Sequence, residues 1–320
     1  MHKIGIIDTM KDKGINLLKS YKDFDCEIVT DLSRENLLLK LPEFDGITLR
    51  RGKIDREILS KCNKLKVIAR HGVGYDSVDT KCLKEKGITL LVAHNSTSTS
   101  PAEHIMFMIM NIYKGVSMFD AMVRDGDFVK AIHLNIEKNF ELFNKTILIA
   151  GFGRIGKKLI KKCLGFDMKV LVFDPYVDDT TIASFGGAKV ATLEEGLKKA
   201  DILSLSLPLN SETKNFITLK EMKLMKKSSI IINAARGGVV NEEDLNNALD
   251  NNIIAFAGID VFEKEPPEPT NPLITNKKVV LSPHAATFTK EGLESMAVET
   301  AQNIIDFFEN KIENTKIVKL

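Results

Sequence analysis

The chain carries, almost halfway along its length, the stretch Thr146-Ile147-Leu148-Ile149-Ala150-Gly151-Phe152-Gly153-Arg154-Ile155-Gly156. The apolar run before Gly151 is rich in branched residues, which predicts a buried parallel strand. The glycines that follow allow a tight turn, the close approach of a pyrophosphate and the packing of a helix on the sheet. The amino terminus of that helix offers N–H groups and a partial positive charge to phosphates. The stretch therefore predicts a dinucleotide site formed by Gly151, Gly153 and Gly156.

A second expected strand, Lys169 to Phe173, leads into Asp174. A carboxylate at this position can accept hydrogen bonds from an adenosine ribose, and it repels the additional phosphate of NADP. Neither Pro175 nor Tyr176 is basic, so NAD is the expected cofactor. The order of strand, glycines, helix, strand and acid favours a cofactor site over an ordinary glycine turn.

Length and composition exclude several classes of protein. A chain of 320 residues with 44% hydrophobic residues can bury a large core, and it favours a division into two domains. Its 45 basic and 43 acidic side chains leave a formal charge of +2, which gives no reason to expect nucleic-acid binding. The apolar run Ile105 to Ile109 is too short to span a bilayer, so no membrane association is expected.

The cysteines indicate a reducing compartment. Cys26, Cys62, Cys82 and Cys163 are scattered and form no Cys-x-x-Cys pair, which is typical of free thiols in a cytoplasmic protein. The segment Met1 to Asp8 alternates into a strand too early for a secretory signal. We expect a cytoplasmic protein without a metal site.

Short apolar runs alternate with helical stretches on both sides of the fingerprint, which predicts an α/β fold with parallel sheets. The expected strands before it are Lys3 to Asp8, Glu27 to Thr30, Gly46 to Leu49, Leu65 to Ala69 and Ile88 to Val92. Those after it are Ile202 to Leu207, Ser229 to Asn233, Ala255 to Ile259 and Val279 to Ser282.

The carboxyl-terminal segment distinguishes two domain arrangements. Lys290 to Glu309 has the apolar spacing of an amphipathic helix and follows the last expected strand. Such a helix can return to cover the first strands of the chain. We therefore expect a nucleotide-binding domain of residues 96–285, inserted into a substrate domain made of residues 1–95 and 286–320. Two consecutive domains are the alternative.

Polar side chains follow three of the later strands, at the edge where open parallel sheets bind ligands. Arg236 lies among small residues, and its guanidinium can bind a carboxylate through two hydrogen bonds. Asp260 and Glu265 follow the next strand, and His284 follows the one after it. Each residue alone is more often structural or solvated. Together they form a set, because a carboxylate beside an imidazole orients the ring and favours its protonated form, a general acid near neutral pH.

The motifs resemble those of the D-2-hydroxyacid dehydrogenase family, in particular its D-3-phosphoglycerate dehydrogenase branch, over nearly the whole chain. The likeness rests on the fingerprint, Ala235-Arg236-Gly237-Gly238, Asp260-Val261-Phe262, Glu265-Pro266, Ser282-Pro283-His284, the run Arg70 to Asp79 and Ala102-Glu103-His104. It implies two Rossmann-like or flavodoxin-like domains, one inserted into the other, and a homodimer formed through a helix from Pro101 to Arg124.

The resemblance also implies roles for residues of this chain. Arg236 would bind the substrate carboxylate and carbonyl oxygen, His284 would be the acid and base, and Glu265 would be the partner of His284. Backbone N–H groups of Val73 and Gly74 would hold the carboxylate from the other side. The implied cofactor contacts are Gly151, Gly153, Arg154, Ile155, Gly156, Asp174, Pro208, Ala234, Asp260 near the nicotinamide carboxamide, and His284.

The reaction implied is hydride transfer between NAD and a D-2-hydroxy acid/2-oxo acid pair, with 3-phosphoglycerate and 3-phosphohydroxypyruvate of serine biosynthesis as the first candidate. A substrate phosphate adds about two negative charges, and Arg50, Lys53 and Arg70 follow expected strands where they can bind it. Ordinary solvated charges on loops are an equal alternative. Family members often have Asn-x-Pro before the interdomain helix, followed by an Asn in the substrate loop, whereas this chain has Val92-Ala93-His94 and Thr97. These differences leave the substrate less defined than the reaction.

The sequence is also compatible with two other functions. A glyoxylate or hydroxypyruvate reductase shares the three catalytic residues and needs fewer cations for its substrate. A non-enzymatic NAD-sensing protein similar to corepressors of this fold is less favoured, because such roles usually come with added tails. No regulatory domain is expected after the last helix.

Overall fold

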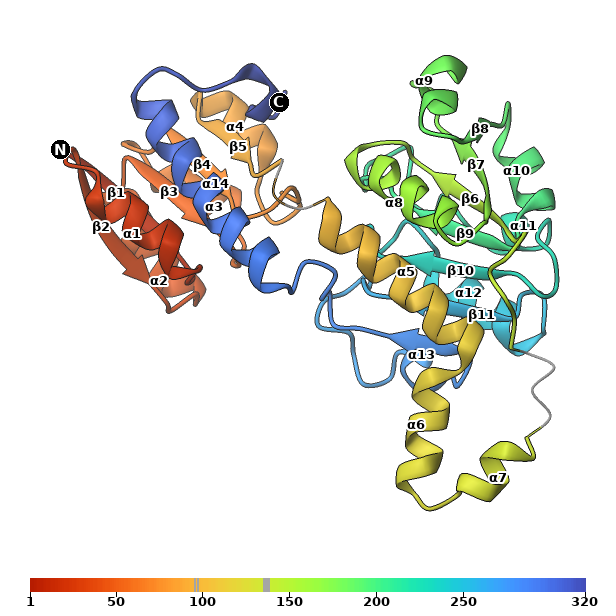
Figure 1. Cartoon of the computed structure of the whole chain (residues 1–320). Coiled ribbons are helices and arrows are strands. Elements are labelled where there is room, and N and C mark those ends of the chain that lie inside the picture. The colour runs from red at the N-terminus through yellow and green to blue at the C-terminus, as the bar shows by residue number, and fades with distance from the viewer. Residues whose placement is uncertain (95, 97, 135–138) are drawn as a thin grey trace. The chain divides into compact units, whose positions relative to one another are not determined.

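The computed structural model describes residues 1–94, 96, 98–134 and 139–320, so Thr97 lies outside the described residues. The chain divides into two compact units (Figure 1). The terminal unit contains Met1–Thr97 and Phe288–Leu320, and the central unit contains Ser98–Thr287. Each unit is built on one parallel sheet with helices on both faces. The predicted α/β fold class with two parallel sheets is confirmed.

The sheet of the terminal unit has the strand order β2-β1-β3-β4-β5, and every neighbouring pair is parallel. Its strands are β1 (His2–Ile7), β2 (Phe24–Val29), β3 (Gly46–Leu49), β4 (Val67–Arg70) and β5 (Thr89–Val92). They are rich in Ile, Leu and Val, which suits a sheet buried on both faces. Since β1 lies between β2 and β3, the direction of strand addition reverses there, and residues that follow β1 and β3 meet at a topological switch point.

Helices cover both faces of this sheet. The helices of one face are α1 (Asp12–Ser20) and α14 (Lys290–Phe308). Those of the other face are α2 (Arg34–Lys40), the 3₁₀ turn η1 (Leu41–Glu43), α3 (Arg56–Lys61) and α4 (Thr80–Lys86), while a second 3₁₀ turn, η2 (Asn314–Lys316), lies near the end of the chain. Helices α1 and α14 lie side by side (Figure 1), and a Cβ on Gly14 would come within 2.4 Å of the Ala297 carbonyl oxygen. Glycine at this position therefore allows the two helices to pack closely.

The sheet of the central unit has the order β12-β11-β10-β9-β6-β7-β8 and is also parallel throughout. Its strands are β6 (Thr146–Ala150), β7 (Lys169–Phe173), β8 (Ala188–Lys189), β9 (Ile202–Leu205), β10 (Ile230–Asn233), β11 (Phe256–Ile259) and β12 (Val279–Leu281). The chain runs outward from β6 to β8 and then returns to β9 on the other side of β6. The switch point of this sheet therefore lies between β6 and β9, beside the glycine fingerprint.

The helices of the central unit form two layers. One face of the sheet packs on α5 (Thr99–Lys114), α8 (Arg154–Leu164) and α9 (Asp179–Ser184). The other face packs on α10 (Leu193–Lys199), α11 (Leu219–Met222), α12 (Glu242–Asp250) and α13 (Pro272–Thr275). Two further helices, α6 (Val116–Arg124) and α7 (Phe128–Ile132), project from the end of α5 (Figure 1).

The segment expected to be one helix from Pro101 to Arg124 is two helices. The helix α5 already begins at Thr99, and it ends at Lys114 because Gly115 adopts a left-handed conformation with φ of 63°. Glycine reaches this conformation without a steric penalty and commonly terminates helices. The new helix α6 starts directly afterwards, at Val116.

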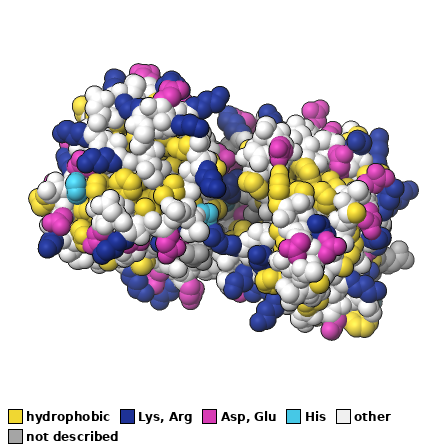
Figure 2. Space-filling model, turned by 90° about the horizontal axis from the view of Figure 1, so that it is seen from above, with side chains coloured by type: hydrophobic (Ala, Val, Ile, Leu, Met, Phe, Trp, Pro, Cys, Tyr) yellow, Lys and Arg dark blue, Asp and Glu magenta, His cyan; other side chains and the backbone are white. Residues whose placement is uncertain are grey.

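None of the described helices is both long and apolar enough to cross a bilayer. Figure 2 shows Lys and Arg side chains interspersed with Asp and Glu on the visible face of each unit. This mixture of signs agrees with the formal charge of +2.

Candidate active site

The three glycines of the fingerprint have different surroundings. A Cβ on Gly151 would lie 2.5 Å from the Ser206 carbonyl oxygen, and one on Gly156 would lie 2.6 Å from the Gly151 carbonyl oxygen. These two glycines permit close packing of the turn, the helix α8 and the segment after β9. A Cβ on Gly153 would meet no described atom within 4 Å. This open space, at the amino terminus of α8, fits the expected pyrophosphate.

Asp174 is fixed at the adjacent strand end. Its Oδ2 accepts the N–H of Phe152 at 2.7 Å, and its Oδ1 accepts the N–H of Tyr176 at 2.9 Å. These two bonds hold the carboxylate beside the glycine turn while its remaining lone pairs can accept further hydrogen bonds. Two other expected cofactor residues follow neighbouring strands: Pro208 comes after β9, and Ala234 comes directly after β10. The side chain of Pro208 is exposed.

The turn that carries Arg236 is held from within. The side chain of Asn233, at the end of β10, donates to the Arg236 carbonyl oxygen at 2.9 Å and accepts the N–H of Ala235 at 3.1 Å. A Cβ on Gly237 would lie only 1.8 Å from the Phe262 carbonyl oxygen. Glycine at this position therefore lets the arginine turn pack directly on the segment that follows β11.

Glu265 and His284 form the expected pair. The Nδ1 atom of His284 lies 2.7 Å from Oε2 of Glu265, whose Oε1 accepts the N–H of Phe262 at 3.1 Å. Burial opposes ionisation of Glu265, but the hydrogen bond and charge of His284, the Phe262 N–H and the charge of Arg236 outweigh it and lower the pKa of Glu265. The three residues predicted from separate strand ends are thus electrostatically coupled in one unit.

The backbone of His284 is held by Asp260. His284 has a φ of 53°, in the left-handed region, and its N–H donates to the Asp260 carbonyl oxygen at 2.7 Å. The Asp260 carboxylate is fully buried and accepts the N–H groups of Ala285 and Ala286 at 2.7 and 3.1 Å, together with the Ser282 hydroxyl. This carboxylate, expected near a nicotinamide, is therefore directed at the loop that carries His284.

The buried carboxylate is ionised. Desolvation opposes this, but hydrogen bonds from His104, Ser282 and the Ala285 N–H outweigh it and lower the pKa of Asp260. The ring atom Nε2 of His104 lies 3.4 Å from Oδ1 of Asp260. His104 belongs to α5, which packs on this side of the sheet.

In the terminal unit, Arg70 binds backbone carbonyls. Its Nε donates to the Gly74 carbonyl oxygen at 2.6 Å, and its Nη1 donates to those of Leu49 and Arg50 at 2.9 and 3.1 Å. The guanidinium therefore closes the loop that contains Val73 and Gly74 onto the end of β3. The structure gives this expected substrate residue a role in shaping the loop.

A second group of cations surrounds Asp8, which follows β1 and is nearly buried. Arg51 donates from Nε to Asp8 at 2.7 Å, and Nη1 of Arg50 lies 3.6 Å from the same carboxylate and donates to the Thr9 carbonyl oxygen at 3.2 Å. Burial raises the pKa of Asp8, but the bond from Arg51 and the other contacts lower it overall. Lys53 is exposed.

Burial and the neighbouring charge of Arg50 lower the pKa of His71 to about 4. Its imidazole is therefore neutral at pH 7 and adds no positive charge to this strand edge.

Sequence reasoning assigned no role to Asp8, Asn233, His104 or Ser282. Asp8 and Asn233 carried a usable signal, since each is a polar residue at the end of an apolar strand. His104 and Ser282 gave weaker signals. Their partners are distant in sequence, and only the folded chain brings them to Asp260.

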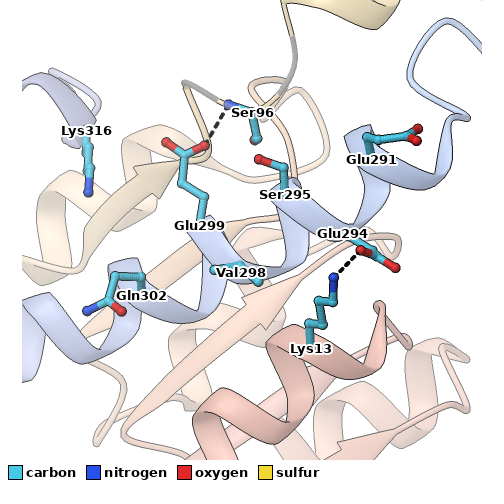
Figure 3. Close-up of a pocket in the computed structure, with 9 residues that line it drawn as sticks. All are labelled: Lys13, Ser96, Glu291, Glu294, Ser295, Val298, Glu299, Gln302 and Lys316. Carbon is cyan, nitrogen blue, oxygen red and sulfur yellow. Dashed lines mark hydrogen bonds and ion pairs between the residues drawn. The ribbon is translucent and has the colours of Figure 1, made fainter.

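A surface hollow of about 630 Å³ lies in the terminal unit along α14 (Figure 3). Its charges are partly paired, since Lys13 binds Glu294 at 2.5 Å and the Ser96 N–H donates to Glu299 at 2.9 Å. Three glutamates and two lysines line it, so its net charge disfavours an anionic ligand. Among the described residues, no cluster of His, Cys, Asp or Glu is arranged to hold a metal ion.

Comparisons with known proteins identify the family of the chain. Residues 106–286 match the family model described as D-isomer specific 2-hydroxyacid dehydrogenase, NAD binding domain. The chain is 34% identical to a D-3-phosphoglycerate dehydrogenase of Methanocaldococcus jannaschii over 95% of this chain and 57% of that protein. It is 33% identical to a glyoxylate reductase of Pyrococcus furiosus over 99% of this chain and 95% of that protein.

A crystal structure of the TT0316 protein from Thermus thermophilus has a TM-score of 0.89 and 28% identity, and the match covers 99% of this chain and 100% of the other. The chain spans 57% and 50% of the length of two D-3-phosphoglycerate dehydrogenases that it matches. Its central unit carries the NAD-binding domain. The chain belongs to the D-isomer specific 2-hydroxyacid dehydrogenase family.

Proposed function

We propose that this protein is an NAD-dependent oxidoreductase that transfers hydride between the nicotinamide and a D-2-hydroxy acid/2-oxo acid pair. The observation that carries the proposal is the 2.7 Å contact between His284 and Glu265, electrostatically coupled to Arg236 at the carboxyl edge of the central sheet. The family membership supports the same reaction type.

The side chains divide the work of the reaction. Arg236 binds the carboxylate and carbonyl oxygen of a 2-oxo acid and stabilises negative charge as it develops on that oxygen. Because Nδ1 of His284 faces Glu265, Nε2 is the nitrogen that donates a proton to the carbonyl oxygen in reduction and accepts it in oxidation. Glu265 orients the ring and stabilises the imidazolium. Bound NAD supplies or accepts the hydride.

The cofactor is held by the glycine turn and the strand ends beside it. Backbone N–H groups of Arg154 and Ile155, at the start of α8, would bind the pyrophosphate over Gly153. Asp174 would accept hydrogen bonds from the adenosine ribose and disfavour NADP. Pro208 and Ala234 would line the same edge.

The first candidate substrate pair is 3-phosphoglycerate and 3-phosphohydroxypyruvate, which would place the protein in serine biosynthesis. Arg50 and Lys53 follow β3 and supply cations for a phosphate, while Arg70 shapes the loop whose Val73 and Gly74 N–H groups would bind the carboxylate. The 34% identity to one D-3-phosphoglycerate dehydrogenase supports this pair.

A glyoxylate or hydroxypyruvate reductase is the second candidate. Two observations favour it: the relative from Pyrococcus furiosus is matched over 95% of its length, and Arg50, Arg51 and Arg70 all bind groups of the protein. Cations engaged in this way contribute less to binding a substrate phosphate. The two candidates differ only in the substrate's tail.

The four cysteines of the chain are free thiols, which supports a cytoplasmic location. Fractionation of the source cells tests this placement.

We also propose that the protein is a homodimer, as expected through the segment Pro101 to Arg124, and that α6 of this segment forms the interface together with the following helix α7. These helices bury none of their residues, and they expose apolar side chains: Val116, Met118, Val123, Phe128, Val129 and Ile132. Exposed apolar surface of this extent is typical of protein interfaces. In sedimentation velocity, the double variant Val129→Asp/Ile132→Asp is expected to be a monomer, whereas Leu39→Asp, at an exposed leucine of the terminal unit, remains a dimer. A dimer that survives the double substitution contradicts the proposal.

Replacing His284 tests the reaction itself. His284→Ala is expected to lower kcat by roughly 10²- to 10⁴-fold, because the proton donor is lost, while the dissociation constant for NADH, measured by fluorescence, changes little. The matched control His133→Ala removes an exposed histidine outside the site and leaves kcat unchanged. Unchanged turnover in His284→Ala removes this residue from its proposed role. If none of the tested 2-oxo acids causes the wild-type protein to oxidise NADH, the proposal that it is an enzyme is wrong.

Replacing Arg50 distinguishes between the two candidate substrates. If Arg50 binds a phosphate, Arg50→Gln raises KM for phosphohydroxypyruvate by roughly 10- to 100-fold, the value of one charge-assisted hydrogen bond, and changes KM for glyoxylate by less than about threefold. Arg56→Gln, which removes an exposed arginine of the same unit, is the control. Equal losses on both substrates count against the phosphate assignment. A wild-type preference for glyoxylate selects the second candidate.

Replacing Asp174 tests the cofactor preference. Asp174→Asn removes the charge and keeps one acceptor oxygen, enough for one of the two N–H groups of Phe152 and Tyr176. The ratio of kcat/KM for NADPH over NADH is expected to rise by roughly tenfold or more, because the repulsion of the additional phosphate is lost. Asp179→Asn makes the same change of charge at an exposed position and serves as the control. A ratio that stays constant in Asp174→Asn shows that another feature selects the cofactor.

A further inference from the structure

A partly buried polar chain connects α5 to the loop that carries His284. The Nε2 atom of His104 lies 2.9 Å from the Ser282 hydroxyl oxygen, and Ser282 in turn donates to Oδ1 of the fully buried Asp260. The three residues come from the helix α5, the segment after β12 and the segment after β11. All of them belong to the central unit, so the chain exists within one compact body.

The proton positions along this chain follow from hydrogen-bond chemistry. A hydroxyl has one proton to donate, and that of Ser282 points to Asp260. The Ser282 oxygen can therefore only accept from His104, which requires a proton on Nε2 of the ring. The same N–H lies 3.4 Å from Oδ1 of Asp260. His104 thus acts on the carboxylate both directly and through the serine.

The carboxylate at the end of this chain fixes backbone rather than side chains. Its two oxygens accept the N–H groups of Ala285 and Ala286, while the carbonyl oxygen of the same residue accepts the N–H of His284. His284 is held at a φ of 53°, a conformation that non-glycine residues rarely adopt without support from their surroundings. The Asp260 carboxylate therefore helps to fix the backbone that carries His284, while Glu265 holds the imidazole ring itself.

We propose that His104 is a positioning residue for the reaction: through its Nε2–H and Ser282 it orients the Asp260 carboxylate toward the amides of Ala285 and Ala286, and so holds His284 where it exchanges its proton. The proposal deepens the proposed function, because it rests on His284 as the acid and base. An apolar side chain of similar size at position 104 would fill the same space on α5 but would supply no hydrogen-bond donor.

Three variants separate the hydrogen bond from the packing. His104→Leu removes the N–H and keeps much of the volume, whereas His104→Gln keeps an amide donor near the position of Nε2. Ser282→Ala interrupts the chain at its centre without a large change in volume. Circular dichroism melting establishes that each variant is folded, and His104→Gln and Ser282→Ala still decide the question if His104→Leu does not fold.

The first measurement does not depend on turnover. Hydrogen exchange of the Ala285 and Ala286 amides, followed by NMR in the full-length protein, is expected to be faster by roughly tenfold or more in His104→Leu and Ser282→Ala, which corresponds to about 1.4 kcal/mol. In His104→Gln the exchange stays close to that of the wild type. Exchange that is equal in all four proteins overturns the proposal.

The second measurement is kinetic. His104→Leu is expected to lower kcat by roughly tenfold or more, with less than a twofold change in the dissociation constant for NADH, and His104→Gln recovers most of kcat. If Gln is no better than Leu, His104 has only a packing role and the proposal is wrong. If the wild type reduces no 2-oxo acid, the proposed function fails, and the exchange experiment alone decides whether His104 positions the loop.

Discussion

The candidate site of the central unit depends on the hydrogen bonds that surround the buried carboxylate of Asp260. Desolvation disfavours a charge at this depth, and the bonds from His104, Ser282 and two backbone amides offset that cost and hold the pKa of Asp260 low. Because the same residue binds the N–H of His284 through its carbonyl oxygen, β11 fixes the loop that follows β12. The backbone of His284 is therefore tied directly to a strand end of the sheet.

The close approach of backbones brings the remaining groups to the same edge. Gly237 permits contact between the arginine turn and the Phe262 carbonyl, which places the segment leading to Glu265 beside Arg236. Gly151 and Gly156 permit equally close packing around the fingerprint, whereas Gly153 faces open space. A side chain at Gly151, Gly156 or Gly237 would collide with backbone atoms of a neighbouring segment. The glycines of this unit thus have two uses: these three allow close packing, and Gly153 leaves space for a ligand.

The fold and the Glu265–His284 pair could be predicted from the sequence because both follow from local patterns. Apolar runs indicated the strands, and parallel strands bring the residues after them to one edge, so Arg236, Glu265 and His284 could be grouped without a structure. The roles of Arg70 and His104 could not be found in this way. Arg70 looked like a free cation, but its guanidinium binds carbonyls of Leu49 and Arg50, about twenty residues away.

The hydrogen bonds of Arg70 to backbone carbonyls also bear on how the terminal unit would bind a substrate. A guanidinium bound to three carbonyl oxygens has few donors left for a phosphate. Its bonds instead tie the loop that contains Val73 and Gly74 to the end of β3 without any ligand. In the proposed reaction, amides preorganised in this way would bind the carboxylate, which every 2-oxo acid carries. The substrate's tail would then meet the side chains near Asp8, where one buried carboxylate already neutralises part of the charge of Arg50 and Arg51. On the proposed function, selection among 2-oxo acids would depend on how much positive charge Asp8 leaves available on Arg50 and Arg51, rather than on how many basic residues follow the strands.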